Sequence, residues 1–590
     1  MQKMTKTFLS CAFLALAVPA SPLLAADAGD HGLIPAAQTV PDILSSKQKQ
    51  LYTQIVAAIR GERWADAKSL LDSADQDPKA GPLTDFLRAE LLTAANSPRA
   101  EVADIMPILA RSPFLPQAEQ LGRLATKRGA TELPALPFQA RLAWAGSAPR
   151  RLGADSVSDP AAARLAATIP DRIKNDDPSG AEMLLNAVLD QLSPEARAEW
   201  MQKVAWSYYI ENDDQNALRL SLACTAGGGA WATQGAWVQG LASWRLRDYR
   251  TALVAFDRVA KEAPDSEQRA AAYYWAARAA IAAGEPASVQ SRLRAAAANE
   301  ETFYGLLAAE TLGVETNAQR ENVRADRSAW RALEDLPNVR LAMALSEIGE
   351  DIYAGQALRH QAQIGNPDQH AQLIAMAGAL SLPETQLYLA HNTPHGRRPA
   401  AQTRYPQPKW EPNGGWKVDP ALVFAHTLQE SRFQRTVVSP AGAFGLMQVR
   451  PGTARDIARW RGDSGTGDLR IPAVNMDMGQ SYLQYLSKDP STGGLLPKVI
   501  AAYNAGPAPI ARWQTEIRDQ GDPLLYMESI PYWETRGYVG IVLRNYWMYE
   551  AQQGKPSVSR AALAQGKWPR FPDSKDRTRL TYASSLANAD

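Results

Sequence analysis

Apolar residues recur at helical spacing through much of the first half of the chain, from about residue 45 to residue 313. This segment is rich in Ala, Leu, Arg and Gln and has few strand signals, so the pattern predicts a long series of helices. Traces of a repeat lie within it. The positions that match a tetratricopeptide unit are Trp237, Gly240 and Trp244 in its first helix, and Ala252, Phe256 and Pro264 in its second helix and end. A further pair begins at residues 271–279 and turns at residues 284–286. We expect a degenerate array of helical hairpins, in which each pair covers the apolar face of its neighbours.

The pattern changes after residue 313. Residues 314–400 keep helical spacing without the repeat, and prolines and glycines crowd residues 392–416. Such a density of helix breakers excludes a long helix and marks a boundary. A compact segment follows to residue 553, and residues 554–590 are polar and expected to pack loosely. The predicted domains are an array of helical hairpins at 29–313, a further helical domain at 314–400, a compact domain at 401–553 and a tail at 554–590.

The first 28 residues have the pattern of a secretory leader. Lys3 and Lys6 precede an apolar run at residues 8–18, and small residues follow at 25–28, where we expect cleavage. The run is too short to span a bilayer, which argues against a membrane anchor. Cys11 lies inside the run rather than at its end, which argues against lipid modification. Cleavage would leave one cysteine, Cys224, which we expect to be buried and inert.

Composition narrows the class of protein. With 590 residues, 45% of them hydrophobic and 21% charged, the chain is typical of a globular protein with several domains. A formal net charge of +1 does not favour nucleic-acid binding. The six histidines are scattered, so no metal site and no cofactor are expected.

One helix in the compact segment places a carboxyl group where it could donate a proton. Asp419 and Pro420 are typical of a helix start, and the predicted helix runs on to Glu430 and Ser431. Near a helix C-terminus the dipole disfavours the ionised form of Glu430, and apolar neighbours would raise its pKa further. Taken alone, Glu430 is better interpreted as an ordinary surface glutamate.

Five blocks around this glutamate change that interpretation. They are Glu-Ser-Arg-Phe at 430–433, Ser-Pro-Ala-Gly-Ala-Phe-Gly-Leu-Met-Gln at 439–448, Asn475 with Gly479, Ala-Tyr-Asn-Ala-Gly at 502–506 and Glu-Thr-Arg-Gly-Tyr-Val at 534–539. In type, order and spacing these blocks resemble those of the soluble lytic transglycosylases, over roughly 140 residues. One departure is Gln434-Arg435, where the family usually has Asn or Asp followed by Pro. Residues 274–279 and 303–308 resemble segments of the helical superhelix of the longer members.

The resemblance implies an all-α dominated fold: an N-terminal ring-like superhelix of helical hairpins and a lysozyme-like catalytic domain with minor β structure at 401–553. It implies cleavage of the bond between N-acetylmuramic acid and N-acetylglucosamine in peptidoglycan by a carbon–oxygen lyase, acting at chain ends or internally. Glu430 would be the single acid and base, and the product would be a 1,6-anhydro sugar. Family positions imply a substrate-binding set of Ser431, Gly445, Met447, Gln448, Tyr503, Asn504 and Glu534.

Several alternatives stay open at this level. Ser431 could instead cap the helix end, Tyr503 could be a core residue, and Glu534 could be a structural partner of Arg536. The aspartates at 456, 463, 468 and 477 are interpreted as solvated surface charges. Competing functions are a hydrolytic muramidase of the same fold and a non-catalytic scaffold that binds the cell wall.

The expected partner is the peptidoglycan glycan strand. Cell-wall synthesis or division proteins are candidate partners of the helical domain, and no nucleic acid is expected. We also expect the protein to be a monomer in the periplasm, with at most loose association with the outer membrane.

Overall fold

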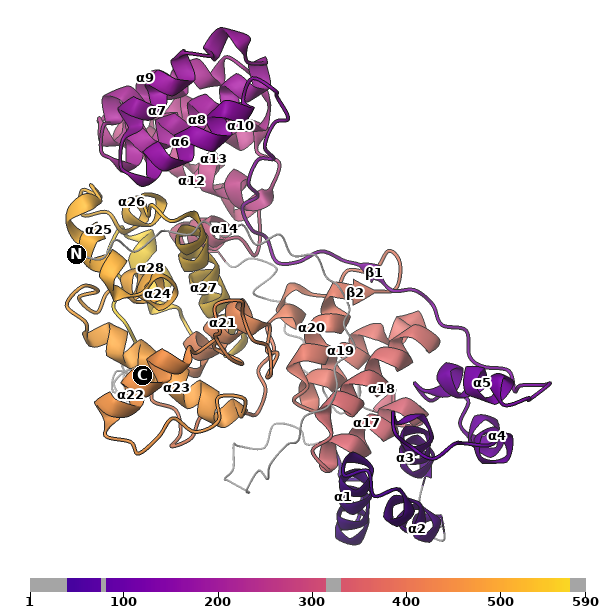
Figure 1. Cartoon of the computed structure of the whole chain (residues 1–590). Coiled ribbons are helices and arrows are strands. Elements are labelled where there is room, and N and C mark those ends of the chain that lie inside the picture. Colours follow the sequence, from indigo (N-terminus) through magenta and orange to yellow (C-terminus); the bar gives the residue numbers. More distant parts are fainter. Residues whose placement is uncertain (1–39, 76–80, 315–330, 573–590) are drawn as a thin grey trace. The chain divides into compact units, whose positions relative to one another are not determined.

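The computed structural model describes residues 40–75, 81–314 and 331–572 (Figure 1). Within these residues the regular secondary structure is helical apart from two strands of two residues each and a few isolated bridges, so the predicted all-α dominated fold is confirmed. The chain forms two compact units. Of the described residues, the first unit comprises 40–75, 81–146 and 331–409, and the second comprises 147–314 and 410–572. The leader at 1–28 lies outside the described residues, and the domain boundaries after residues 28, 313, 400 and 553 stay predictions.

The first unit joins two helical segments around one apolar core. Its elements are α1 (Ser46–Arg60), α2 (Trp64–Ala74), α3 (Gly81–Thr93), α4 (Val102–Arg111), α5 (Ala118–Lys127), β1 (Ala143–Trp144), α17 (Pro337–Glu347), α18 (Asp351–Ile364), η3 (Pro367–Gln369), α19 (His370–Ala379), α20 (Pro383–His391), β2 (Asn392–Thr393) and η4 (Ala401–Arg404). Strands β1 and β2 pair antiparallel. Glu347 accepts hydrogen bonds from the backbone of Ile43 and Leu44, which ties the two segments together.

The second unit begins with the expected helical hairpins. Its first elements are α6 (Ala163–Lys174), α7 (Pro178–Asn186), η1 (Leu189–Gln191), α8 (Pro194–Ile210), α9 (Asp214–Thr225), α10 (Gly229–Arg245), α11 (Tyr249–Glu262), α12 (Ser266–Ala282), η2 (Pro286–Ser288), α13 (Val289–Ala297) and α14 (Phe303–Leu312). The predicted hairpin is α10 with α11, where a Cβ on Gly240 would lie 2.5 Å from the Phe256 ring. Glycine is therefore needed for the close approach of these helices. Cys224 is buried, as predicted.

The second segment of this unit is also helical. It contains α21 (Pro420–Ser431), α22 (Pro451–Arg461), α23 (Pro472–Lys488), α24 (Leu496–Ala505), α25 (Pro507–Glu516), α26 (Pro523–Glu528), α27 (Trp533–Gln552) and α28 (Val558–Ala564). Helix α27 packs against both α21 and α24 and is the central element (Figure 1). The β structure is limited to isolated bridges, two of which join Phe444 to Val438 and to Val449.

Buried polar contacts hold the two segments of the second unit together. Arg151 donates two hydrogen bonds of 2.7 Å to the carboxylate of Glu528, at the end of α26. Tyr304 of α14 donates a third, also at 2.7 Å. Nearby, Arg245 donates to the Ser529 hydroxyl and to Asp214. A buried carboxylate with this many donors is stable only while all of them stay in place, so α26 is fixed firmly at the start of α27.

The predicted loose packing of the tail is wrong for residues 554–572. Helix α28 packs on α14, and the indole N–H of Trp547 donates to the Ser559 hydroxyl. Leu563 is fully buried, and Pro569 accepts a hydrogen bond from the backbone of Leu496. A few apolar residues among many polar ones are enough to anchor this segment, because a helix needs only one buried stripe.

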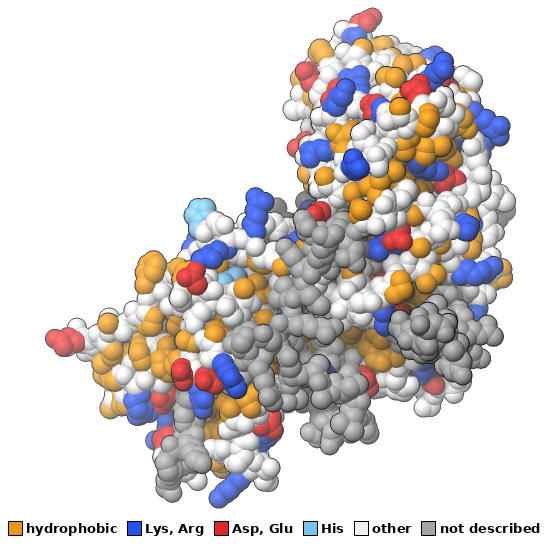
Figure 2. Space-filling model, turned by 180° about the vertical axis from the view of Figure 1, so that it is seen from behind, with side chains coloured by type: hydrophobic (Ala, Val, Ile, Leu, Met, Phe, Trp, Pro, Cys, Tyr) orange, Lys and Arg blue, Asp and Glu red, His pale blue; other side chains and the backbone are white. Residues whose placement is uncertain are grey.

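No helix among the described residues is long and apolar enough to cross a membrane. On the face seen in Figure 2, basic and acidic side chains are intermixed rather than gathered into fields of one sign. This distribution agrees with the near-neutral formal charge of the chain.

Candidate active site

Helix α21 delivers Glu430 to its C-terminal end. The predicted helix start is confirmed: the Asp419 carboxylate accepts a hydrogen bond from the backbone of Ala421, and Pro420 lies in the first turn. The helix ends after Ser431 because Arg432 and Phe433 both have left-handed backbone, with φ of 51° and 64°. The carboxyl group therefore lies where the helix dipole opposes a negative charge.

The surroundings of Glu430 favour its protonated form. The side chain is partly buried, and its Oε1 atom accepts a hydrogen bond of 2.6 Å from the Tyr538 hydroxyl of α27. Burial raises its pKa to about 7; the Tyr538 hydrogen bond acts in the opposite direction, and the charge of Glu534 adds to the rise. No Lys or Arg in the described part of the chain forms an ion pair with Glu430. Near neutral pH the group can thus both give and take a proton.

A neutral histidine lies one turn before the glutamate on α21. His426 is fully buried, and its ring lies 4.7 Å from the Tyr503 ring and 5.9 Å from the Tyr538 ring. Burial lowers its pKa to about 3, so the imidazole carries no charge at neutral pH. This aromatic layer supplies no cation that would stabilise the ionised form of Glu430.

The glycine-punctuated loop at 439–448 is held tightly against α23. Gly445 has φ of +67°, and a Cβ there would lie 2.6 Å from the Asn475 amide and 2.8 Å from the Leu469 carbonyl. Glycine is therefore required at this position for both reasons. The Asn475 side chain accepts a hydrogen bond from the backbone of Met447 and donates to the carbonyls of Phe444 and Leu469. Asn475 thus acts as the clip that fixes the loop.

Met447 does not line an open surface. Its side chain is fully buried and packs against α23 at Gly479, where any Cβ would clash with its sulfur. Only its backbone carbonyl reaches the site, where it accepts a hydrogen bond of 2.8 Å from the Tyr503 hydroxyl. The hypothesis that Met447 lines a sugar subsite with its side chain therefore has no support in this geometry.

Two polar residues of the predicted set also serve the loop. The Ser431 hydroxyl donates to the carbonyls of Leu446 and Thr427, at 2.7 and 3.2 Å, so it ties the helix end to the loop. The Gln448 amide donates to the carbonyls of Gly445 and Val437. Both side chains use their hydrogen bonds to hold the backbone in place beside Glu430.

The remaining two predicted residues lie at the start of α27. The Asn504 side chain accepts a hydrogen bond of 2.6 Å from Thr535, which joins the end of α24 to α27. Glu534 is exposed and close enough to raise the pKa of Glu430. The alternative that pairs Glu534 with Arg536 is not observed, since Arg536 lies over the Trp206 ring at 4.0 Å and donates to the Glu528 carbonyl.

Sequence reasoning missed three residues of this site: Tyr538, His426 and Asn475. Tyr538 and Asn475 are fixed positions of the recognised blocks, so their presence signalled a role that the motif alone did not specify. His426 is outside the fixed positions. Its spacing of four residues from Glu430 places both side chains on one helix face and could have indicated it.

The interpretation of Asp477 as a solvated surface charge is wrong. Its side chain is 5% exposed and forms ion pairs with Lys417 at 2.8 Å and Arg461 at 2.6 Å. Burial acts to raise its pKa, but the hydrogen bonds from Lys417 and Arg461 outweigh burial and lower it. Asp477 is therefore a structural anion and not a second reacting carboxyl.

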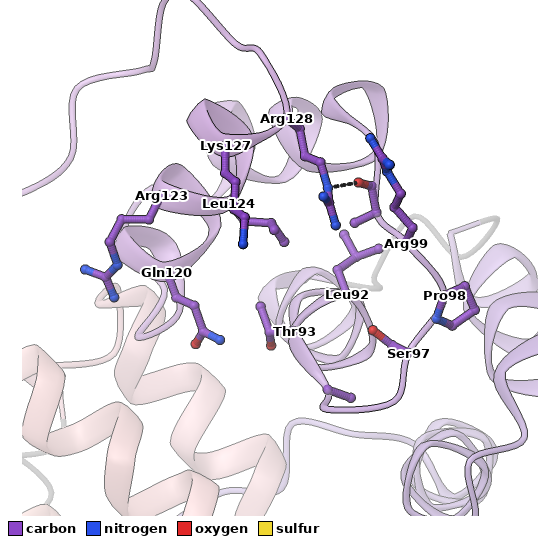
Figure 3. Close-up of a pocket in the computed structure, with 12 residues that line it drawn as sticks. Leu92, Thr93, Ser97, Pro98, Arg99, Gln120, Arg123, Leu124, Lys127 and Arg128 are labelled. Carbon is purple, nitrogen blue, oxygen red and sulfur yellow. Dashed lines mark hydrogen bonds between the residues drawn. The ribbon is translucent and has the colours of Figure 1, made fainter.

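A separate hollow of about 400 Å³ lies in the first unit, between the ends of α3 and α5 (Figure 3). Its rim carries the basic side chains of Arg99, Arg123, Lys127 and Arg128, and Arg128 donates to the Ala100 carbonyl. It contains no carboxyl group and none of the five sequence blocks. No group of His, Cys, Asp or Glu side chains suited to a metal ion occurs among the described residues.

Comparison with known proteins finds a family match over the first four of the five blocks, while the block at 534–539 lies beyond it. The Transglycosylase SLT domain family matches residues 411–524. The soluble lytic murein transglycosylase of Salmonella typhimurium is 29% identical over 312 residues, which cover 50% of this chain and 46% of that protein. The Escherichia coli K12 protein of the same name is 37% identical over 151 residues, which cover 25% of this chain and 23% of that protein. The matched segments thus span less than half the length of these relatives.

Two solved structures share the fold. An inactive mutant of the lytic transglycosylase Slt from Pseudomonas aeruginosa is 20% identical, with a TM-score of 0.52 and 89% of each chain covered. The 70 kDa soluble lytic transglycosylase from Escherichia coli is 18% identical, with the same TM-score, over 89% of this chain and 99% of that one. Residues 411–524 therefore match the Transglycosylase SLT domain family, and the resemblance of this chain to the soluble lytic murein transglycosylases is confirmed.

Proposed function

We propose that this protein is a lytic transglycosylase that cleaves the β-1,4 bond between N-acetylmuramic acid and N-acetylglucosamine in peptidoglycan and leaves 1,6-anhydro ends. The observation that carries the proposal is the state of Glu430: a carboxyl group of an SLT domain with a pKa raised to about 7, one neutral hydrogen-bond donor and no ion pair with Lys or Arg among the described residues.

The first step uses Glu430 as an acid. Tyr538 holds Oε1, and Oε2 has no hydrogen-bond partner among the described residues, so the proton on Oε2 faces outward. It passes to the glycosidic oxygen as the bond to the anomeric carbon of the muramic sugar breaks. The acetamido group of the same sugar stabilises the positive charge that develops, which is the substrate-assisted exception to the two-carboxylate rule.

The second step uses the same group as a base. Ionised Glu430 takes the proton from the 6-hydroxyl of the muramic sugar, whose oxygen attacks the anomeric carbon and closes the 1,6-anhydro ring. The carboxyl group ends the cycle protonated, and no water is consumed. A pKa of about 7 suits both halves, because neither protonation state is strongly disfavoured.

The other predicted residues take two kinds of role in this proposal. Ser431, Gly445 and Gln448 fix the loop beside Glu430. The buried Met447 side chain packs the loop against α23. Tyr503 and Asn504, which are partly buried, and Glu534, which is exposed, supply a phenol ring, an amide and a carboxylate for contact with sugar hydroxyls and the acetamido group. The substrate lies outside the cytoplasm, which the predicted leader at 1–28 would allow the protein to reach. The helical segments before the SLT domain are proposed as the place where other cell-wall proteins bind.

The alternatives are a hydrolytic muramidase and a non-catalytic scaffold. The test is to digest purified sacculi with the wild-type protein and with Glu430→Gln, and to analyse the released fragments by mass spectrometry. We expect anhydro ends, lighter by one water than reducing ends, from the wild type only. Reducing muramic ends would favour the muramidase, and full cleavage by a folded Glu430→Gln protein would overturn the role of Glu430.

A further inference from the structure

A row of aromatic rings runs from the neighbourhood of Glu430 to the surface of the SLT domain. The Tyr503 ring lies 5.4 Å from the Tyr482 ring, and Tyr482 lies 6.4 Å from Tyr485 with an angle of 14° between the planes. The Tyr485 ring lies 5.7 Å from that of Trp460, at 77°. The row thus crosses three helices, α24, α23 and α22, which pack side by side (Figure 1).

The geometry of the helices explains this alignment. Tyr482 and Tyr485 are three residues apart on α23, so their side chains lie on one face. Trp460 is the penultimate residue of α22, and the left-handed Gly462 ends that helix just after it. Exposure grows outward along the row: Tyr503 and Tyr482 are partly buried, Tyr485 is 38% exposed and Trp460 is 44% exposed.

Core packing does not account for the positions of Tyr485 and Trp460, because both rings are exposed. Single exposed apolar residues are common, but two adjacent exposed rings that continue a row from a candidate acid form one surface. Indole and phenol rings suit the apolar faces of pyranose sugars, because both are flat and need no hydrogen-bond partner on that face.

A cation accompanies the outer ring. The Lys488 ammonium lies 5.3 Å from the centre of the Trp460 ring, and its side chain is exposed. Neither Asp489 nor Asp456 forms an ion pair with Lys488: Asp489 accepts a hydrogen bond from Ser491, and Asp456 pairs with Arg459. The surface therefore combines a ring that suits any sugar with a positive charge that suits a sugar bearing a carboxylate.

We propose that Trp460, Tyr485 and Lys488 form an outer subsite for the glycan strand, several sugars from the bond that is cleaved. The occupant is a β-1,4-linked strand of N-acetylglucosamine and N-acetylmuramic acid, with the carboxylate of a muramic substituent facing Lys488. The inference rests on the proposed function, since it extends the same groove, and the continuity of the rings from Tyr503 to Trp460 is what selects a glycan over a protein partner.

Binding experiments in a Glu430→Gln background separate the subsite from catalysis. The probes are N-acetylglucosamine oligosaccharides of two to eight units, titrated by calorimetry. We expect Trp460→Ala to weaken binding of the longest oligosaccharides about tenfold, equivalent to about 1.4 kcal/mol, and to leave the shortest unaffected. Trp460→Phe should restore most of the affinity. Trp144→Ala is the matched control, because Trp144 is 60% exposed and lies in the first compact unit.

A second variant tests the charge. Lys488→Gln should weaken binding of uncrosslinked strands that contain muramic acid and leave neutral N-acetylglucosamine oligosaccharides unchanged. In an active background, Trp460→Ala should raise KM on sacculi with little change in kcat. If affinity rises with oligosaccharide length equally in the wild-type and Trp460→Ala proteins, the proposed subsite is wrong, whether or not anhydro ends are produced. Loss of anhydro ends from the wild type would instead overturn the proposed function while leaving length-dependent binding intact.

Discussion

Glu430 and Glu267 lie in the same compact unit, and burial raises the pKa of each carboxyl to about 7. Glu267 lies in the first turn of α12, and both of its oxygens accept hydrogen bonds from the backbone of Phe303 at the start of α14. It thus lies at two helix N-termini, where a negative charge is stabilised, and the charges of Arg544 and Arg151 also oppose the rise. Glu430 lies at a helix C-terminus and has one hydroxyl as its partner.

The difference shows that a raised pKa does not identify a catalytic group. Glu267 is 9% exposed, and its oxygens are occupied in holding the first turn of α14. Glu430 is more exposed, lies beside a fixed glycine loop and keeps one oxygen without a partner among the described residues. The two groups differ in whether a carboxyl oxygen is available to an incoming sugar, and the following substitutions test that difference.

The largest effect is expected from Glu430→Gln. Loss of the only acid and base in the proposed mechanism should lower kcat on sacculi by about 10²–10⁴-fold, the usual contribution of such a group. The melting temperature should not fall, because the amide removes a buried charge and keeps the side-chain volume. Release of soluble fragments and a thermal melt at pH 8 measure the two quantities. Retention of more than about a tenth of the activity would contradict the assignment.

Tyr538→Phe should have an intermediate effect. In the wild type, kcat/KM should fall as pH rises through about 7, because Glu430 must be protonated to act as the acid. The Tyr538 hydrogen bond lowers the pKa of Glu430, so its removal should move this descending limb to higher pH. At pH 5 the rate should fall about fivefold, the effect of one lost positioning hydrogen bond. If the descending limb stays at the same pH, Tyr538 does not affect the pKa of Glu430.

Glu534→Gln should move the same limb in the opposite direction. The negative charge of Glu534 raises the pKa of Glu430, so a neutral amide should let Glu430 ionise at lower pH. The shift should shrink at high salt because Glu534 is exposed. The measurement is the pH profile of kcat/KM at low and high ionic strength. A shift toward higher pH would show that Glu534 acts by contact with the substrate and not by its charge.

The smallest effect on catalysis is expected from Glu267→Gln, with kcat on sacculi within about twofold of the wild type. Its effect should appear in stability instead. The folded-state pKa lies above the ordinary value of 4.5, so the folded chain keeps a proton that the unfolded chain has lost, and the free energy of unfolding falls as pH rises from about 4.5 to 7. The variant should lose part of this pH dependence, as measured by urea unfolding between pH 4 and pH 8. If Glu267→Gln loses much of its activity while its stability is unchanged, the assignment of Glu267 as structural and Glu430 as catalytic is wrong.

Local features of the fold could be predicted from the sequence, because their causes lie within a few residues. The Asp419 cap, the Pro420 start and the α10–α11 hairpin depend on short-range spacing and are confirmed. Glu430 and the loop around Gly445 could be recognised because five blocks occur in one order. Their roles in catalysis stay proposals.

Long-range contacts could not be predicted in this way. Tyr538 reaches Glu430 across 108 residues of chain, and Arg151 reaches Glu528 across 377. Nothing in the local pattern distinguishes Asp477 from the solvated aspartates near it, because its burial depends on Lys417 and Arg461 from other elements. Met447 belongs to the substrate-binding set that the family resemblance implies, but the small size of Gly479 makes a pocket for its side chain in the core, which no local pattern predicts.

The contact between Arg151 and Glu528 also bears on how the chain acquires its structure. A ribosome releases the N-terminal segment of the second unit long before the segment that carries α26, and the chain folds into the other unit in between. Arg151 and Tyr304 therefore lack this carboxylate partner until the segment that carries Glu528 has also folded. Truncated or stalled chains would present an incomplete arginine and tyrosine surface, which makes them natural targets for chaperones and proteases.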